Sequence, residues 1–163
     1  MISMSETELF TFFQEHSICE SLTKQDVEKL THYLIEKDVS SGDMILDRGD
    51  VGDFLGFIVS GKVEFISFKG QGPAPVGKQG EGSLIGEMSF FDRKPRDLRM
   101  EAGKKGVKIL ELTRPMYDRL KVEEPYIAVN ILENAIVSLD ILVRNMSNDI
   151  SALGSYMKGF GKQ

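Results

Sequence analysis

The sequence predicts a mainly β domain, a small antiparallel barrel or jelly roll with helices at both ends. Short apolar runs recur between residues 44 and 112 at spacings of about 10 to 15 residues, separated by glycine-containing turns. No ten-residue helical pattern lies between these runs, which argues against a parallel α/β sheet. Residues 126–153 contain neither glycine nor proline, which favours one long helix after the sheet.

The composition suits one soluble domain in a reducing, cytoplasmic environment. A chain of 163 residues is long enough for a single core, and its net charge of −5 opposes a nucleic-acid-binding surface. No apolar run approaches the roughly 18 residues that a transmembrane helix needs, so no membrane contact is expected. The N-terminus lacks the basic region of a secretory signal. The single cysteine, Cys19, excludes an internal disulfide and a cysteine-based zinc site.

Residues 1–38 are expected to form the N-terminal helices of the domain. Ser5 or Thr7 is a suitable N-cap for a first helix that reaches about residue 16. Thr23 and Asp26 have the spacing of a capping box for a second helix. Apolar residues at helical spacing extend that second helix to residue 36.

Residues 39–113 are expected to form the β-roll. Turn compositions such as Asp47–Asp50, Ser60-Gly61 and Lys69–Pro73 divide this region into short strands. The predicted strands are residues 44–46, 54–59, 63–68, 74–79, 98–100 and 107–112. Between the fourth and the fifth of them, Met88–Phe91 has the pattern of a single helical turn.

Residues 114–153 are expected to be helical, with Thr113 as N-cap and a break at Glu124-Pro125. Steps of three and four connect an apolar seam, formed by Leu132, Ala135, Leu139, Leu142 and Met146. A flanking row at a step of seven contains Ile136, Val143 and Ile150. The stripe could pack on its own roll, but its length favours a homodimer through residues 127–153. The glycine-rich residues 154–163 are expected to form a flexible tail.

The stretch from Gly82 to Ala102 carries the chemistry of an anion site. Its glycines and short helical turn can present backbone N–H groups to an anion, and Arg96 can add a planar, permanently charged fork. Glu87 is an unusual neighbour for an anion, unless it accepts hydrogen bonds from hydroxyl groups beside the charge. An anion that also carries a sugar hydroxyl would satisfy both side chains.

The glycine spacing resembles that of the cyclic nucleotide-binding domain family, which includes bacterial catabolite activators and regulatory domains of kinases and channels. Ser41–Asp50 and Gly52–Glu64 look like the front half of that family. Gly80–Gly82, followed by Leu84–Glu87, resembles the entry to its phosphate-binding cassette, and Pro95-Arg96 resembles the end. The resemblance covers about residues 9–153. It implies an eight-stranded β-roll whose cassette holds the ribose-phosphate and whose long C-terminal helix closes over the base.

The resemblance also implies roles for individual residues. Glu87 would bind the ribose 2′-hydroxyl and Arg96 the cyclic phosphate, assisted by backbone N–H groups of the turn that contains Gly86, Met88 and Ser89. The positions that correspond to the base pocket and to the approach of the long helix are Phe65, Val76, Leu142, Val143 and Asn145.

After Arg96 the sequence departs from the family, which usually has a small or hydroxyl residue next. Here Asp97 follows, and then Leu98 and Arg99. On a strand, Asp97 and Arg99 would share a face and could pair, or Asp97 could be solvated. Alternatively, Asp97 could accept a hydrogen bond from a base amino group. Leu142 stands where activators often present a hydroxyl to adenine, so base selection is expected to differ from the familiar pattern.

These observations predict a cyclic nucleotide sensor that couples binding to the packing of a dimerisation helix, with cAMP favoured over cGMP. No catalytic group and no metal site are expected; Asp43, Asp47, Asp50 and Asp53 lack the pattern of a calcium loop. Two alternatives remain open. One is a dimerisation or interaction module with a vestigial pocket, and the other is a truncated transcription regulator without its DNA-binding domain. DNA binding by this chain is not expected, and the output domain or partner is open.

Overall fold

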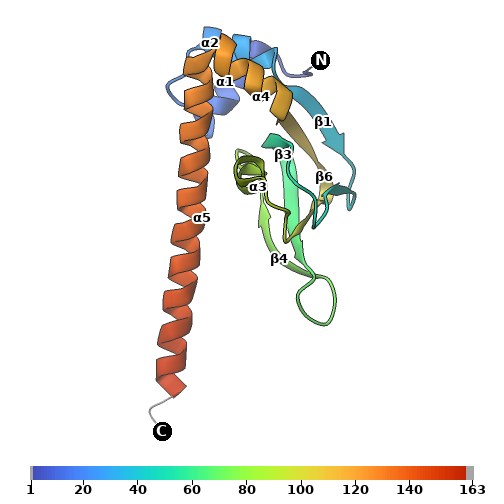
Figure 1. The fold of residues 1–163 in the computed structure, drawn as a ribbon, viewed down its shortest axis with the longest axis vertical. Coiled ribbons are helices and arrows are strands. Elements are labelled where there is room, and N and C mark those ends of the chain that lie inside the picture. Colours follow the sequence, from blue (N-terminus) through green and yellow to red (C-terminus); the bar gives the residue numbers. More distant parts are fainter. Residues whose placement is uncertain (1, 161–163) are drawn as a thin grey trace.

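The computed structural model describes the backbone of residues 2–160, and within it the side chains of residues 2–145, 147 and 148. Met146 and Ile150, predicted for the apolar rows, therefore lie outside the described side chains. Helices α1 (Glu6–Glu15), α2 (Lys24–Thr31) and α4 (Arg114–Glu123) gather at one end of a β-roll (Figure 1). Helix α5 (Pro125–Phe160) starts in this group of helices and extends past the roll (Figure 1).

The roll is one antiparallel sheet of six strands within the described residues. Its strands are β1 (Ile35–Val39), β2 (Met44–Leu46), β3 (Phe54–Ser67), β4 (Ala74–Gln79), β5 (Leu84–Ile85) and β6 (Arg99–Thr113). The order is β1-β6-β3-β4, with β2 paired to β6 and β5 paired to β3. The short helix α3 (Glu87–Asp92) follows β5. The predicted class, mainly β with flanking helices and a long C-terminal helix, is confirmed.

Strands β3 and β6 each span two of the six predicted short strands, and β1 and β5 are additional, so the described sheet has six strands where the resemblance implied eight. Strand β3 continues through Ser60-Gly61, which was predicted to end a strand, and pairs with β6 from Phe54↔Thr113 to Ile66↔Arg99. The register shifts on both sides of Ser60-Gly61, where the strands bend. A glycine with φ of 81° is compatible with a bulge as well as with a turn, and only the pairing partner decides between them.

The predicted helix starts are confirmed, whereas the end of the second helix is not. Ser5 and Thr23 both form capping boxes, with Glu8 and Asp26 respectively. Helix α2 ends at Thr31 instead of residue 36, because residues 35–39 pair with β6 as strand β1. The sheet therefore begins before the predicted boundary at residue 39.

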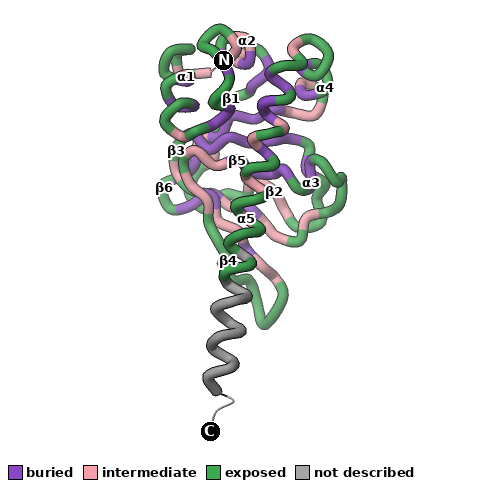
Figure 2. The backbone as a smooth tube through the Cα atoms, turned by 90° about the vertical axis from the view of Figure 1, so that its left-hand side faces the viewer, coloured by how far each residue is buried: buried purple, intermediate pink, exposed green. Residues whose placement is uncertain are grey.

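Two apolar clusters form the core (Figure 2). One joins α1, α2, α4 and the start of α5 to the near ends of the strands; Leu9, Phe13 and Phe57 in it are completely buried. The other fills the roll and contains Ile58, Val63, Ile85, Met100, Ala102, Val107 and Ile109. The helices and the roll therefore share one folded unit.

The buried side chains among the described residues of helix α5 lie near its start. Ile131 and Ala135 are buried in the first cluster, and Leu132 packs against it. Part of the seam predicted for a partner is therefore used within the domain, whereas Ile136 and Val143 in the flanking row are 66% and 58% exposed. The helix also continues to Phe160, past the predicted end at residue 153, because a helix tolerates isolated glycines at about 1 kcal/mol each.

The N-terminal part of α5 is strongly apolar, although no long apolar run was expected. Within Pro125–Asn145 an 18-residue window has a mean hydropathy of 1.6, and 28% of it is buried. By length and composition alone this segment could cross a membrane, a property that it shares with apolar helices of soluble proteins.

The close approach of the β3 backbone at Gly61 to the β6 backbone at Gly106 provides a test of the fold. A Cβ atom at Gly61 would lie 2.1 Å from the Gly106 carbonyl oxygen, at a positive φ. We expect Gly61→Ala to lower the free energy of unfolding by about 2 kcal/mol or more, measured by denaturant titration. Gly77→Ala is the matched control, because a Cβ there meets nothing within 4 Å, and it should leave stability unchanged or slightly raised. Equal effects of the two substitutions would contradict the register.

Candidate functional site

The stretch between β5 and β6 folds as a closed loop around α3. Gly86, with φ of 87°, precedes the helix, and its carbonyl accepts the N–H of Phe90 at 3.1 Å. The N–H groups of residues 87–89 therefore have no partner within the helix. The Ser89 hydroxyl accepts the N–H of Gly52 at 2.7 Å and donates to the carbonyl of Lys94 at 2.7 Å. The Ser89 side chain thus holds the loop together, and only its N–H is available to a ligand.

Arg96, at the end of this loop, has its guanidinium close to Gly52 and Gly86. Its backbone pairs with the segment after β2, through Arg96 N–H to Asp50 O at 2.9 Å and Gly49 N–H to Arg96 O at 2.8 Å. A Cβ atom on Gly52 or Gly86 would come within 2.8 or 3.2 Å of the Arg96 Nη2 atom. Both positions therefore need glycine for the guanidinium to lie where it does.

The Arg96 guanidinium has unused hydrogen-bonding capacity. Its Nε and Nη2 atoms are buried and have no hydrogen-bond partner among the described residues. Burial lowers the pKa of Arg96, and the negative charges of Glu87, Asp50 and Asp53 oppose that shift. A buried donor without a partner is costly, and more so when it is charged. The site is therefore suited to an anion that can accept from a planar fork.

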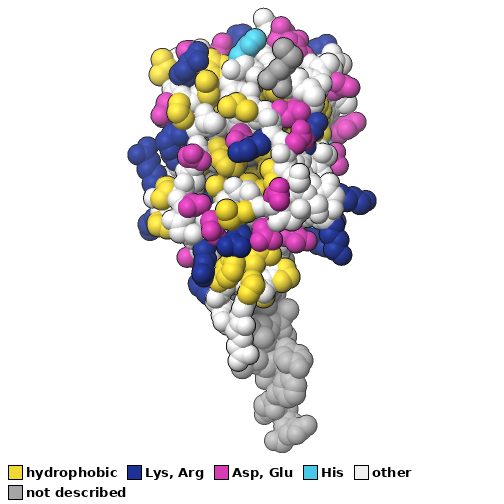
Figure 3. All heavy atoms as spheres, turned by 90° about the vertical axis from the view of Figure 1, so that its right-hand side faces the viewer, with side chains coloured by type: hydrophobic (Ala, Val, Ile, Leu, Met, Phe, Trp, Pro, Cys, Tyr) yellow, Lys and Arg dark blue, Asp and Glu magenta, His cyan; other side chains and the backbone are white. Residues whose placement is uncertain are grey.

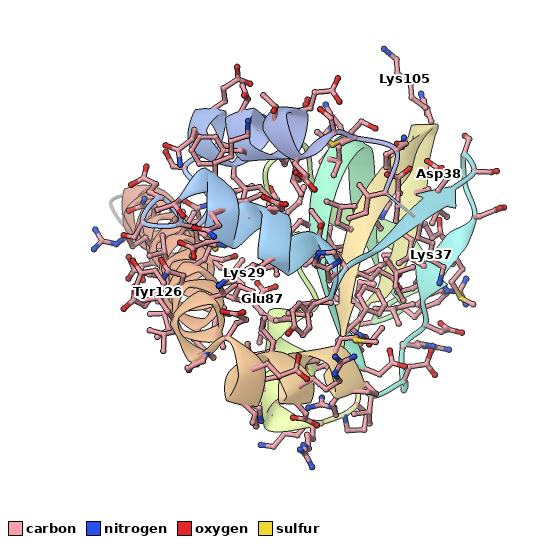
Figure 4. All side chains as sticks on the ribbon, turned by 90° about the horizontal axis from the view of Figure 1, so that it is seen from above. Lys29, Lys37, Asp38, Glu87, Lys105 and Tyr126 are labelled. Atoms are coloured by element: carbon pink, nitrogen blue, oxygen red, sulfur yellow. The ribbon has the colours of Figure 1, made fainter. Side chains whose placement is uncertain are left out.

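Glu87, the first residue of α3, contacts the long helix. It is only 6% exposed, and its Oε1 atom accepts a hydrogen bond from the Ser138 hydroxyl of α5 at 3.3 Å. In Figure 4 Glu87 lies between α5 and the roll. Burial raises the pKa of Glu87, while a hydrogen bond from its own backbone N–H, the Ser138 hydrogen bond and the charge of Arg96 act in the opposite direction. A carboxylate has about four lone-pair sites, so it can also accept from another hydroxyl donor.

Helix α4 also holds the loop. The Arg114 side chain donates to the carbonyl of Gly52 at 3.1 Å and to that of Phe90, and its guanidinium lies 4.2 Å from the centre of the Phe90 ring. Phe90 and Phe91 both make edge-to-face contacts with Tyr117. The loop that carries Glu87 therefore touches the roll, α4 and α5.

Of the two structural expectations for Asp97, solvation agrees with the structure and pairing with Arg99 does not. Arg99 Nε lies 3.0 Å from Asp47 Oδ1, and Arg99 Nη1 lies 3.7 Å from Glu101 Oε1. Asp97 is exposed and lies in a bend before β6, so the alternation of strand side chains does not apply to it. The acidic residue that follows the anion site is thereby directed to solvent.

The other predicted site residues are less buried than Glu87 and make no hydrogen bond to Glu87 or Arg96 among the described contacts. Phe65 is half-buried against the interior cluster. Val76 is 58% exposed and unpaired where the register of β3 and β4 shifts. The side chain of Met88 is also 58% exposed, so only its backbone faces the loop interior. On α5, Leu142 is half-buried one turn after Ser138, and Asn145 is exposed.

Ser138 and Arg114 were not predicted as site residues. A basic residue in the first turn of a helix opposes the helix dipole, so Arg114 was a detectable anomaly in the sequence. Ser138 interrupts an apolar helix, but its contact depends on how α5 docks, which no local pattern contains. Within the described residues no group of three or more His, Cys, Asp or Glu could hold a metal ion.

Comparison with known proteins agrees with this geometry. The family model described as "Cyclic nucleotide-binding domain" matches residues 36–121. A cAMP-dependent protein kinase regulatory subunit of Debaryomyces hansenii is 29% identical over 119 residues, which are 72% of this chain and 25% of that protein. The chain thus spans about a quarter of the length of that relative.

Solved structures show the same fold. A cyclic nucleotide-binding domain from Methylobacillus flagellatus superposes with a TM-score of 0.78 and 25% identity, over 88% of this chain and 83% of the other. The catabolite activator protein of Thermus thermophilus superposes with a TM-score of 0.70 and 25% identity, over 84% of this chain and 62% of the other. The matched model covers more than half of the sequence. The chain belongs to the cyclic nucleotide-binding domain family.

Proposed function

We propose that this chain is a cyclic nucleotide sensor that binds cAMP in preference to cGMP and has no catalytic activity of its own. The observation that carries the proposal is the buried Arg96 guanidinium, whose Nε and Nη2 atoms have no partner among the described residues. A cyclic phosphate would accept from both N–H groups, and the N–H groups at the start of α3 would assist. The Glu87 carboxylate would accept from the ribose 2′-hydroxyl.

The choice of cAMP is supported by the Debaryomyces hansenii relative, which is a cAMP-dependent protein kinase regulatory subunit. A regulatory role without catalysis and a cytoplasmic location are consistent with that relationship. We do not propose that this chain itself binds DNA, because its net charge is −5 and basic and acidic side chains are interspersed on the face in Figure 3.

Nucleotide binding is coupled to α5 in this proposal. The ribose hydroxyl and the Ser138 hydroxyl would share the Glu87 carboxylate, and Arg114 connects the same loop to α4. A ligand shifts a conformational equilibrium only by its difference in affinity between the two states. Contacts made through Glu87 to α5 would provide that difference.

A homodimer through residues 127–153 is the proposed partner arrangement. Val129, Ile136 and Val143 recur at steps of seven and are 48%, 66% and 58% exposed. In Figure 4 Tyr126, which precedes this row by one turn, points away from the roll. A second copy of the same helix would cover such a row, as in other coiled coils.

Arg96→Ala tests the phosphate site. Because it removes a buried, charge-assisted pair of hydrogen bonds, we expect the Kd for cAMP to rise about 100-fold or more in calorimetric titration. Lys94→Ala is the control, because it removes an exposed cation from the same loop and should leave the affinity within about threefold. An unchanged affinity in Arg96→Ala would place the phosphate elsewhere. A wild-type protein that binds no cyclic nucleotide below about millimolar concentration would leave the vestigial-pocket alternative.

Glu87→Gln tests whether the carboxylate is kept for the ligand at the expense of stability. Since burial raises its pKa, the folded state holds this proton to higher pH than the unfolded state does, and ionisation opposes folding. We expect Glu87→Gln to raise the Tm at pH 7.5 and to weaken cAMP binding. The gain in Tm should vanish as the pH falls towards the ordinary pKa of glutamate. A lower Tm at pH 7.5 would show that Glu87 stabilises the fold.

Ile136→Asp tests the helix interface. A charge in the exposed row should convert a dimer into a monomer, measured as molar mass by light scattering. Asp140→Asn, on the same helix, should leave the mass unchanged. A monomeric wild-type protein, or a dimeric Ile136→Asp variant, would exclude this interface.

A further inference from the structure

Few buried polar side-chain atoms lack a hydrogen-bond partner in the described part of the chain. They are Gln79 Oε1, Arg96 Nε, Arg96 Nη2 and Glu111 Oε1. Glu111 has a nearby cation, since its Oε1 atom lies 3.6 Å from Lys37 Nζ. Arg96 is accounted for by the proposed phosphate. Gln79 remains: its amide oxygen is buried and accepts no hydrogen bond from the described residues.

Strand pairing places the Gln79 side chain on the inner face of the roll. Gln79 in β4 is directly opposite Val63 in β3, and Val63 is opposite Ala102 in β6. Directly opposed residues of antiparallel strands project to the same face of a sheet. Val63 and Ala102 belong to the cluster that fills the roll, so Gln79 faces the same interior.

The neighbouring row connects this position to the anion site. Gly77, Phe65 and Met100 are opposed across the same three strands, one two-residue step from the Gln79 row. The Arg96 Nη1 atom lies 3.9 Å from Met100 Sδ. Gly77 is exposed and a Cβ atom there would meet nothing within 4 Å, so the sheet surface beside Phe65 is open to solvent. An apolar ring and a free space thus lie between Arg96 and Gln79.

The spacing fits a mononucleotide. Two strand separations and one two-residue step put the Cα atoms of Met100 and Gln79 about 12 Å apart. This separation leaves room for a nucleotide that lies along the sheet. Its phosphate would be at Arg96 and the far edge of its base at Gln79.

We infer that Gln79 is a specificity-determining residue whose amide reads an adenine-type base, one with an exocyclic amino group next to a ring nitrogen acceptor. This inference rests on the proposed function and assigns base selection within the same site. The buried Oε1 atom accepts from the amino group, and the amide nitrogen donates to the adjacent ring nitrogen. Glutamine and adenine pair in this bidentate way in protein–DNA complexes. The major-groove edge of guanine offers two acceptors and would leave Oε1 without a donor.

The test compares two ligands that differ only in the amino group. These are cAMP and the 3′,5′-cyclic phosphate of purine riboside, which lacks the 6-amino group. The wild-type protein should bind cAMP about tenfold or more tightly than the purine analogue. In Gln79→Met, which keeps the length of the side chain but has no amide, this ratio should fall to near one. The affinity for the purine analogue itself should change little.

Lys78→Met is the matched control. Lys78 is the preceding residue of β4, is exposed and projects to the opposite face, so its substitution should leave the ratio at the wild-type value. Gln79→Val serves if the methionine variant does not fold, because β-branched residues suit a strand.

The outcomes separate the two proposals. An undiminished ratio in both Gln79 variants would overturn the inference and leave the proposed function intact. Equal affinity of the wild-type protein for the two ligands would overturn it as well. Failure of the wild-type protein to bind either ligand would instead refute the proposed function, and the inference with it.

Discussion

The buried guanidinium of Arg96 constrains everything around it. Two of its N–H-bearing nitrogens have no partner among the described residues, and only glycine at positions 52 and 86 leaves room for it. Its backbone is held by the loop after β2, and Ser89 closes α3 against Gly52. Several local interactions therefore hold the Arg96 guanidinium in place, although burying it without hydrogen-bond partners is unfavourable. Such an arrangement suits the proposed anion site, because a preorganised site meets the desolvation cost during folding.

The same loop links the ligand site to the helices. Glu87 is buried against Ser138 of α5, and Arg114 at the start of α4 reaches both Gly52 and Phe90. Because α4 and α5 follow each other directly, the loop contacts both the start of α4 and the side of α5. Beyond Ala135 few of the described α5 side chains are buried, so little packing opposes a change in its direction. In the proposed function, these short polar contacts would carry the effect of the nucleotide to the long helix.

One face of α5 packs into the domain core and another is exposed. Ile131 and Ala135 complete the core of the helical end, while Ile136 and Val143 are left exposed. The sequence pattern contains both rows, but it does not say which of them the domain itself covers. Similarly, the inner face of the roll carries Gln79 beside Val63, although Gln79 belongs to no recognisable motif. Both cases depend on which element docks on which.

Local chemistry determined much of this protein from sequence alone. The helix starts at Ser5 and Thr23, the turn after Gly86 and the Glu87/Arg96 pair are encoded within a few residues, so their patterns could be interpreted directly. The end of α2, the continuity of β3 and β6, and the pairing of Arg99 with Asp47 were decided only by tertiary structure. In each case, an interaction with a residue distant in the chain is formed instead of the one that the local sequence favours. Helix propensity and turn preference are worth only about 1 kcal/mol per residue, so pairing across the sheet outweighs them. Ser138 belongs with them, since its contact with Glu87 exists only once α5 has docked.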